Sequence, residues 1–222
     1  MRDYVDVTYN PRHKPFTGYP FKLAAYLSER YNIRPGDILL DAGCGRGEYL
    51  AGFTEQGVLA TGFDQSLIAQ EYYPFLDVRV ENLEQPSWSH RLSDTWDVIL
   101  AKSLIEHLRY PERFVQSAFR ALAPGGLVIL ITPDWRQCYR EFYGDHTHRS
   151  PFTLHSLEEM LICTGFDEVE GEYFYQLPEM WPRMWLMPVV HAIARIIPNQ
   201  LRTKFFEFAS YSMLLATGRK PE

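Results

Sequence analysis

Residues 38–50 constrain the possible folds more than any other part of the chain, and they read I-L-L-D-A-G-C-G-R-G-E-Y-L. Three apolar residues lead into Asp41, three glycines follow at alternate positions, and helix-forming residues come next. This order predicts a buried strand, a tight turn and the start of a helix. Glycine suits backbone at positive φ or close to a ligand, and a helix N-terminus offers unpaired N–H groups. The turn is therefore a candidate binding site for a small molecule.

The spacing of the glycines argues against two nucleotide-binding motifs. A dinucleotide fingerprint needs G-x-G-x-x-G, but the position of its last glycine is occupied by Glu48. The phosphate-binding P-loop needs Lys followed by Ser or Thr, and neither pair follows here. Asp41, at the end of the predicted strand, would attract an ammonium group and repel a pyrophosphate. A glycine-rich turn that binds no ligand remains the structural alternative.

Four sequence blocks follow one another in a recognisable order. They read L-L-D-A-G-C-G-R-G, T-G-F-D-Q-S, W-D-V-I-L-A-K-S-L-I-E-H-L and R-A-L-A-P-G-G-L-V-I-L-I-T-P. Together they resemble the class I S-adenosylmethionine-dependent methyltransferases over about residues 34–175. The resemblance implies S-adenosyl-L-methionine as the cofactor. It also implies an α/β fold in which a doubly wound, seven-stranded, mostly parallel Rossmann-like sheet ends in an antiparallel strand.

The hydrophobic pattern along the chain agrees with such a fold. Short apolar strands alternate with helical segments, as in α/β proteins with helices on both faces of the sheet. Ser156 and Glu159 have the spacing of a capping box, which predicts a helix start there. The last strand is expected at about 208–218. We expect residues 1–222 to form a single domain, since two domains would each be small.

Composition limits the possible partners and compartment. Hydrophobic residues make up 46% of the chain and charged residues 23%, as in ordinary globular proteins. The net charge is −6 and the basic residues are scattered, so we expect no nucleic-acid partner. Three widely spaced cysteines indicate a reducing compartment. The N-terminus lacks the apolar core of a signal peptide, so a cytoplasmic location is expected.

Two segments outside the common pattern are candidates for contacts with an acceptor or a partner. Residues 1–33 are expected to form an irregular arm and a helix, which in related methyltransferases often close over the cofactor. Residues 175–207 form an apolar insertion that could be a lid, a homodimer contact or a peripheral membrane contact through 183–204. In the membrane alternative, apolar residues enter lipid and basic residues meet headgroups: Trp185, Leu186, Val189 and Ile193, with Arg183, Arg195, Arg202 and Lys204.

The resemblance and the strand ends together assign the cofactor contacts. Asp41, Gly43, Gly45 and Gly47 are expected at the methionine end, and Asp64, at the tip of the second strand, at the ribose diol. The resemblance places Asn82 and Leu83 at the adenine, with Glu81 as the alternative acid. The remaining expected cofactor-binding residues are Cys44, Gln65 and Lys102.

A hydroxyl acceptor must lose a proton during methyl transfer, and near neutral pH histidine is the first candidate for the base. We expect His148 to serve, because Asp145 and Thr147 beside it could orient its ring. His107 is the second candidate and His146 the third, and a structural role remains the alternative for each.

A closer likeness bears on the acceptor and on metal. T-H-R-S-P-F-T-L-H-S-L followed by C-T-G-F resembles ubiquinone-pathway O-methyltransferases and methyltransferases of polysaccharide gene clusters. In the ubiquinone group, the likeness implies a divalent ion at Glu-x-x-Glu-His. Here Ser103 replaces the first Glu, and Glu106 and His107 alone rarely hold an ion, so we expect no required metal.

This likeness indicates O-methylation of a small molecule, either a sugar or a lipid-linked or phenolic intermediate. A small-molecule N-methyltransferase is one alternative, since an amine needs little help from a base. A catalytically inactive binding protein with the same fold is another.

Overall fold

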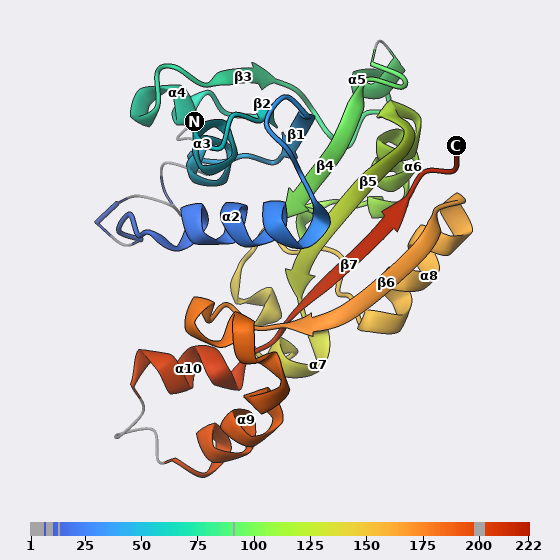
Figure 1. Ribbon diagram of the computed structural model, residues 1–222. Helices are drawn as coiled ribbons and strands as arrows, with labels where there is room; N and C mark the ends of the chain where they lie inside the picture. Colours follow the sequence, from blue (N-terminus) through green and yellow to red (C-terminus); the bar gives the residue numbers. More distant parts are fainter. Residues whose placement is uncertain (1–6, 8–10, 13, 91, 198–202) are drawn as a thin grey trace.

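The computed structural model describes residues 7, 11–12, 14–90, 92–197 and 203–222, so parts of the predicted arm and insertion lie outside the described residues. The described part contains a seven-stranded sheet in the order β3-β2-β1-β4-β5-β7-β6 (Figure 1). The strands are β1 Ile38–Ala42, β2 Leu59–Asp64, β3 Asp77–Val80, β4 Trp96–Lys102, β5 Leu122–Pro133, β6 Asp167–Phe174 and β7 Met213–Arg219.

The sheet is mostly parallel. Strands β1, β2, β3, β4 and β5 pair in parallel, whereas β7 lies antiparallel to both β5 and β6. The predicted doubly wound sheet with an antiparallel last strand is therefore confirmed. The strand order changes direction at β1, whose neighbours are β2 and β4. Ligands of open α/β sheets bind at such a switch point, beyond the carboxyl ends of the strands.

Helices cover both faces of the sheet, because successive residues in each central strand point to opposite sides. The helices of the described residues, 3-10 turns included, are α2 Tyr19–Tyr31, α3 Glu48–Glu55, α4 Ile68–Tyr72, α5 Ser87–His90, η1 Ile105–His107, α6 Pro111–Ala121, α7 Trp135–Cys138, η2 Phe142–Gly144, α8 Leu154–Thr164, η3 Pro178–Leu186, α9 Met187–Ile196 and α10 Lys204–Ser210. Leu40 joins one hydrophobic cluster with residues of α6 and α8, and Leu39 joins another with residues of α2 and α3.

Two local predictions need correction. The capping box of α8 is formed by Thr153 and Ser156, because the Thr153 side chain accepts from the Ser156 N–H and the helix starts at Leu154. The predicted partner Glu159 therefore lies inside the helix. The last strand begins at Met213 and not near 208, because α10 continues to Ser210.

The insertion forms a helical cluster of its own. Helices η3, α9 and α10 gather around a small buried core that includes Met187, Ala194 and Ala209. Trp181 packs this cluster against the main core. The centre of its ring lies 4.6 Å from that of Tyr26 and 5.8 Å from that of Phe174. In the described part of the chain, every helix is too short or too polar to cross a bilayer.

Candidate functional site

The three glycines after β1 all have positive φ but differ in their surroundings. Gly43, Gly45 and Gly47 have φ values of 76°, 53° and 80°. A Cβ on Gly45 would meet none of the described atoms within 4 Å, whereas one on Gly47 would lie 2.8 Å from the Leu76 side chain. Gly45 therefore leaves open space for a ligand, and Gly47 allows the start of α3 to pack closely.

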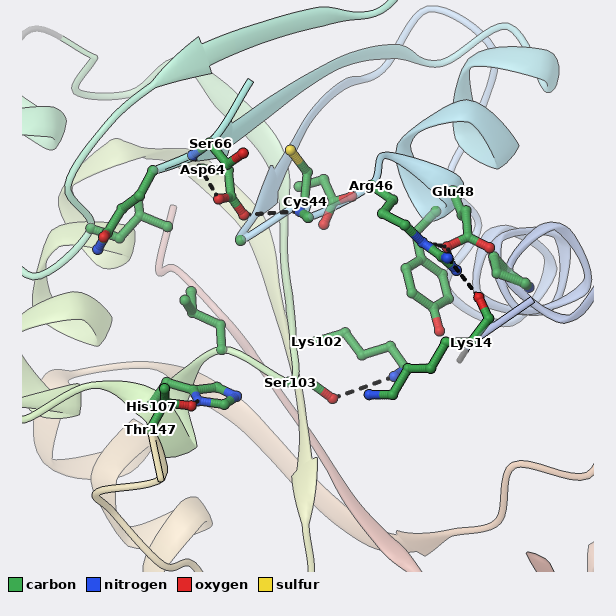
Figure 2. A pocket seen from close by; sticks show the side chains of 18 of the residues that line it. Lys14, Cys44, Arg46, Glu48, Asp64, Ser66, Lys102, Ser103, His107 and Thr147 are labelled. Atoms are coloured by element: carbon green, nitrogen blue, oxygen red, sulfur yellow. Dashed lines mark hydrogen bonds and ion pairs between the residues drawn. The ribbon is translucent and has the colours of Figure 1, made fainter. Parts of the chain in front are cut away.

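A cavity of about 690 Å³ opens at this turn, at the carboxyl ends of β1, β2 and β4 (Figure 2). Eight of the predicted cofactor residues line it: Asp41, Gly43, Cys44, Gly45, Asp64, Gln65, Leu83 and Lys102. Further lining residues include Lys14, Tyr19, Arg46, Glu48, Tyr49, Ser66, Glu81, Ser103, Leu104, His107, Leu108 and Thr147. Of the residues described, the predicted contacts Gly47 and Asn82 lie outside this lining.

Asp41 has a buried carboxylate oxygen that lacks a hydrogen-bond donor among the described residues. Its side chain is 2% exposed, and its Oδ2 has no hydrogen-bond partner among the described residues. Burial, followed by the charge of Asp64, raises the pKa of the Asp41 carboxyl to about 7. A buried carboxylate is costly unless it is paired. A cationic group in the cavity would supply the missing partner, which fits the ammonium of an amino-acid moiety.

Backbone groups hold the Asp64 carboxylate in place at the tip of β2. Its Oδ2 accepts from the Gly45 N–H at 2.9 Å, and its Oδ1 accepts from the Ser66 N–H at 3.0 Å. Each carboxylate oxygen can accept a further bond, so the group fits a diol. In Figure 2 the carboxylate points toward the cavity from the side opposite His107.

The neighbouring predicted residues differ in what they offer. Cys44 is 5% exposed, and burial raises the pKa of its thiol, so it packs as an unreactive group. The Asn82 Oδ1 accepts from the Glu84 N–H at 3.0 Å, which closes a turn. Glu81 and Leu83 on either side line the cavity instead.

Two further ionisable groups are Lys102, which is half-buried and lines the cavity, and Glu106, which is buried. Burial lowers the pKa of Lys102, whose ammonium lies 5.1 Å from the centre of the Tyr49 ring. Glu106 is 1% exposed and accepts from the Thr132 hydroxyl at 3.0 Å. Burial raises the pKa of the Glu106 carboxyl to about 7. Burial is the main cause of each shift, and the charge of each group opposes the shift of the other.

Of the three predicted histidines, His107 lines the cavity. Its Nδ1 lies 2.8 Å from the Thr147 hydroxyl, which donates to the Asp145 carboxylate at 2.6 Å. Burial lowers the pKa of His107 to about 4, so the ring is neutral at pH 7. The Nδ1 of His148 lies 2.6 Å from the Phe142 carbonyl, and the His146 carbonyl accepts from the Arg149 guanidinium at 2.7 Å.

Glu106, His107 and His148 could also hold a metal ion. Each offers one ligand atom, and these atoms lie within 4.8 Å of one another. The sequence places His148 far from the other two, so the Glu-x-x-Glu-His comparison alone could not find it. The two ring Nδ1 atoms have oxygen partners, which is the usual arrangement of histidines that bind metal through Nε2. The expectation that no metal is required therefore stays a prediction.

Residues 14–16 contact Arg46 in the glycine turn. The Arg46 guanidinium donates to the Lys14 carbonyl at 2.7 Å and lies 4.4 Å from the centre of the Phe16 ring. It also pairs with the Glu48 carboxylate, at 2.6 Å. No hydrophobic periodicity in the sequence indicates this contact, so Arg46 and Lys14 were not predicted as parts of the site.

Comparison with known proteins identifies the family. A family model described as "Methyltransferase domain" matches residues 14–170, which is most of the chain. The chain belongs to this family. It is a class I methyltransferase by its sheet and its motifs, and S-adenosyl-L-methionine is its cofactor.

Individual relatives of this methyltransferase are more distant. A "Probable S-adenosylmethionine-dependent methyltransferase" of Mycolicibacterium smegmatis is 32% identical over 60% of this chain and 52% of its own length. A "Ubiquinone biosynthesis O-methyltransferase" of Pseudomonas fluorescens is 27% identical over 48% of each chain. The chain thus spans about half the length of these relatives.

The fold is shared with solved structures. Phosphoethanolamine N-methyltransferase 2 of Haemonchus contortus, in complex with S-adenosyl-L-methionine, has a TM-score of 0.67 and 17% identity, over 100% of this chain and 60% of that one. The cavity of the present methyltransferase fits the cofactor on its own geometry, because the Asp41 Oδ2 has no hydrogen-bond donor among the described residues and the Asp64 carboxylate can accept from a diol.

Proposed function

We propose that this chain is an S-adenosyl-L-methionine-dependent O-methyltransferase that acts on a hydroxyl of a small molecule. The cofactor supplies a methyl group already activated on a sulfonium. Asp41 would hold the ammonium of the methionine end, Asp64 the ribose, and Glu81 with Leu83 the adenine. The O-methylating relative of Pseudomonas fluorescens supports the choice of a hydroxyl over an amine. The acceptor class is a sugar or a lipid-linked or phenolic intermediate.

The main support for the proposal is the set of hydrogen bonds that joins His107 to Thr147 and Thr147 to Asp145. Because the Thr147 hydroxyl donates its hydrogen to Asp145, its oxygen is left to accept from His107 Nδ1–H. This assigns the proton of the neutral ring to Nδ1 and the lone pair to Nε2. His107 on the cavity wall is then oriented as a base for a hydroxyl proton.

His107 replaces His148 as our first candidate for the base. His148 lies outside the cavity lining, and its ring centre is 4.7 Å from that of His107. After burial, a positive charge on His148 contributes to the lowered pKa of His107. The Asp145 carboxylate opposes this effect and would stabilise the ring once it has taken the proton.

The test is methyl transfer from labelled cofactor to a panel of phenols, sugars and amines. We expect transfer to hydroxyls, and His107→Ala should lower kcat by about 100-fold or more while leaving cofactor affinity within a factor of two or so. His146→Ala, which changes a histidine outside the cavity lining, is the matched control and should keep most of the activity.

Two results would replace the proposal. Transfer to amines alone, undiminished in His107→Ala, would favour an N-methyltransferase, because an amine lone pair needs little help from a base. Absence of transfer across the panel, together with a tight protein complex, would favour a binding protein that has lost catalysis.

A further inference from the structure

A row of large apolar side chains lies exposed on the insertion. Val189, Ile193 and Ile196 follow the spacing of one face of α9, and Trp185 precedes them by one further turn. Their exposed fractions are 60%, 46% and 81%, and that of Trp185 is 77%. The opposite side of the helix is buried against α10 and η3. Contiguous apolar surface of this kind marks an interaction site.

The charge of the insertion is opposite to that of the whole chain. Residues 175–207 carry four basic residues and two acidic ones, Glu179 and Glu207, whereas the net charge of the chain is −6. Arg183, which precedes Trp185 by two residues in η3, is exposed. Between these two acids every charged residue is basic, and an apolar row in such a segment is the pattern of helices that lie in the headgroup region of anionic bilayers.

The insertion lies on the same edge of the sheet as the cavity. Since β7 is antiparallel to both β5 and β6, strands β5 and β6 run in the same direction. The chain leaves β6 at the carboxyl edge, and α9 and α10 project beyond it in Figure 1. Trp181 of η3 also contacts Tyr19, a cavity residue, with ring centres 6.0 Å apart. A surface that held α9 would therefore lie near the mouth of the site.

We propose that the exposed face formed by Trp185, Val189, Ile193 and Ile196 docks on an anionic lipid bilayer. Helix α9 has ten residues and is about 15 Å long, too short to span a bilayer but suited to lie along its surface. A second copy of the chain fits less well, because a two-fold contact would set the same basic segment against itself. The inference goes beyond the proposed function and does not depend on methyl transfer.

Flotation with vesicles tests the proposal on the full chain without cofactor or acceptor. We expect the protein to float with vesicles of equal parts phosphatidylglycerol and phosphatidylcholine, and far less with phosphatidylcholine alone. The double variant Trp185→Ser/Ile196→Ser should lower the partition coefficient by about tenfold or more. The matched control is Phe75→Ser/Ile162→Ser, which removes side chains exposed by 66% and 60% outside the insertion and should change little.

A charge reversal adds an independent arm. Arg183→Glu should weaken binding to the anionic vesicles several-fold, whereas Arg34→Glu, at the opposite edge of the sheet, should not. Circular dichroism confirms that each variant is folded. Equal binding by wild type and the Trp185→Ser/Ile196→Ser variant, or no flotation with either vesicle, would overturn the proposal. A dimer that the same double variant dissociates, without vesicle binding, would instead make this face a contact between copies.

Discussion

Lowering the pH should weaken cofactor binding, because it protonates the Asp41 carboxylate. In the free protein the pKa of this carboxyl is about 7, because it is buried and lies near Asp64. Binding a cationic ammonium favours the carboxylate, so the pKa falls in the complex and binding releases a proton below pH 7. The carboxyl is about half ionised at pH 7 and about 3% ionised at pH 5.5. Affinity should therefore fall about 15-fold between these two values.

Calorimetric titration with S-adenosylhomocysteine measures this effect, since the ligand keeps the ammonium and cannot react. An α-ammonium stays largely protonated below pH 7, so the ligand's own titration contributes little. Asp41→Asn should bind weakly at both pH values, with no slope. Glu106→Gln should keep the slope, although the pKa of Glu106 is also about 7. An affinity in wild type that is constant from pH 7 to pH 5.5 would show that the Asp41 carboxylate does not pair with the ligand's ammonium.

Three further predictions concern stability and metal. Between about pH 4 and pH 7 the Asp41 carboxyl binds more protons in the folded protein than in the unfolded chain, so its contribution to the free energy of unfolding falls as the pH rises. Asp41→Asn should therefore stabilise the protein at pH 8 by on the order of 2 kcal/mol, and by less at pH 5, as measured by urea denaturation. Gly47→Ala should lower the melting temperature more than Gly45→Ala, because the added Cβ at position 47 would lie 2.8 Å from the Leu76 side chain. Equal losses in the two variants would contradict the separate roles of the two glycines. Prolonged chelation should leave methyl transfer unchanged, and activity that a divalent ion restores would instead make Glu106, His107 and His148 a metal site.

The sheet could be predicted from the sequence because its signals are local. Apolar runs bounded by glycines and prolines fix the strands, and the acids at the ends of β1 and β2 follow from their place in the motif. Asp41, Gly45 and Asp64 meet in one cavity because the carboxyl ends of neighbouring parallel strands share an edge. The boundary between α10 and β7 was not predictable, since the mostly apolar stretch 205–216 fits either element.

The acceptor side of the site depends on contacts between distant segments, which the sequence does not encode locally. Sequence neighbours favoured His148, because Asp145 and Thr147 lie beside it. In the fold, Thr147 instead faces His107, which is 40 residues away in the chain. The contact between Arg46 and the Lys14 carbonyl likewise joins a turn to a segment without periodicity.

We expect the cavity after β1 to bind S-adenosyl-L-methionine between Asp41 and Asp64. A crystal structure with S-adenosylhomocysteine would show whether it does. The ligand's ammonium should lie at the Asp41 carboxylate and its ribose hydroxyls at the Asp64 carboxylate. A nucleoside bound elsewhere, or reversed so that its ribose lies at Asp41, would contradict this expectation.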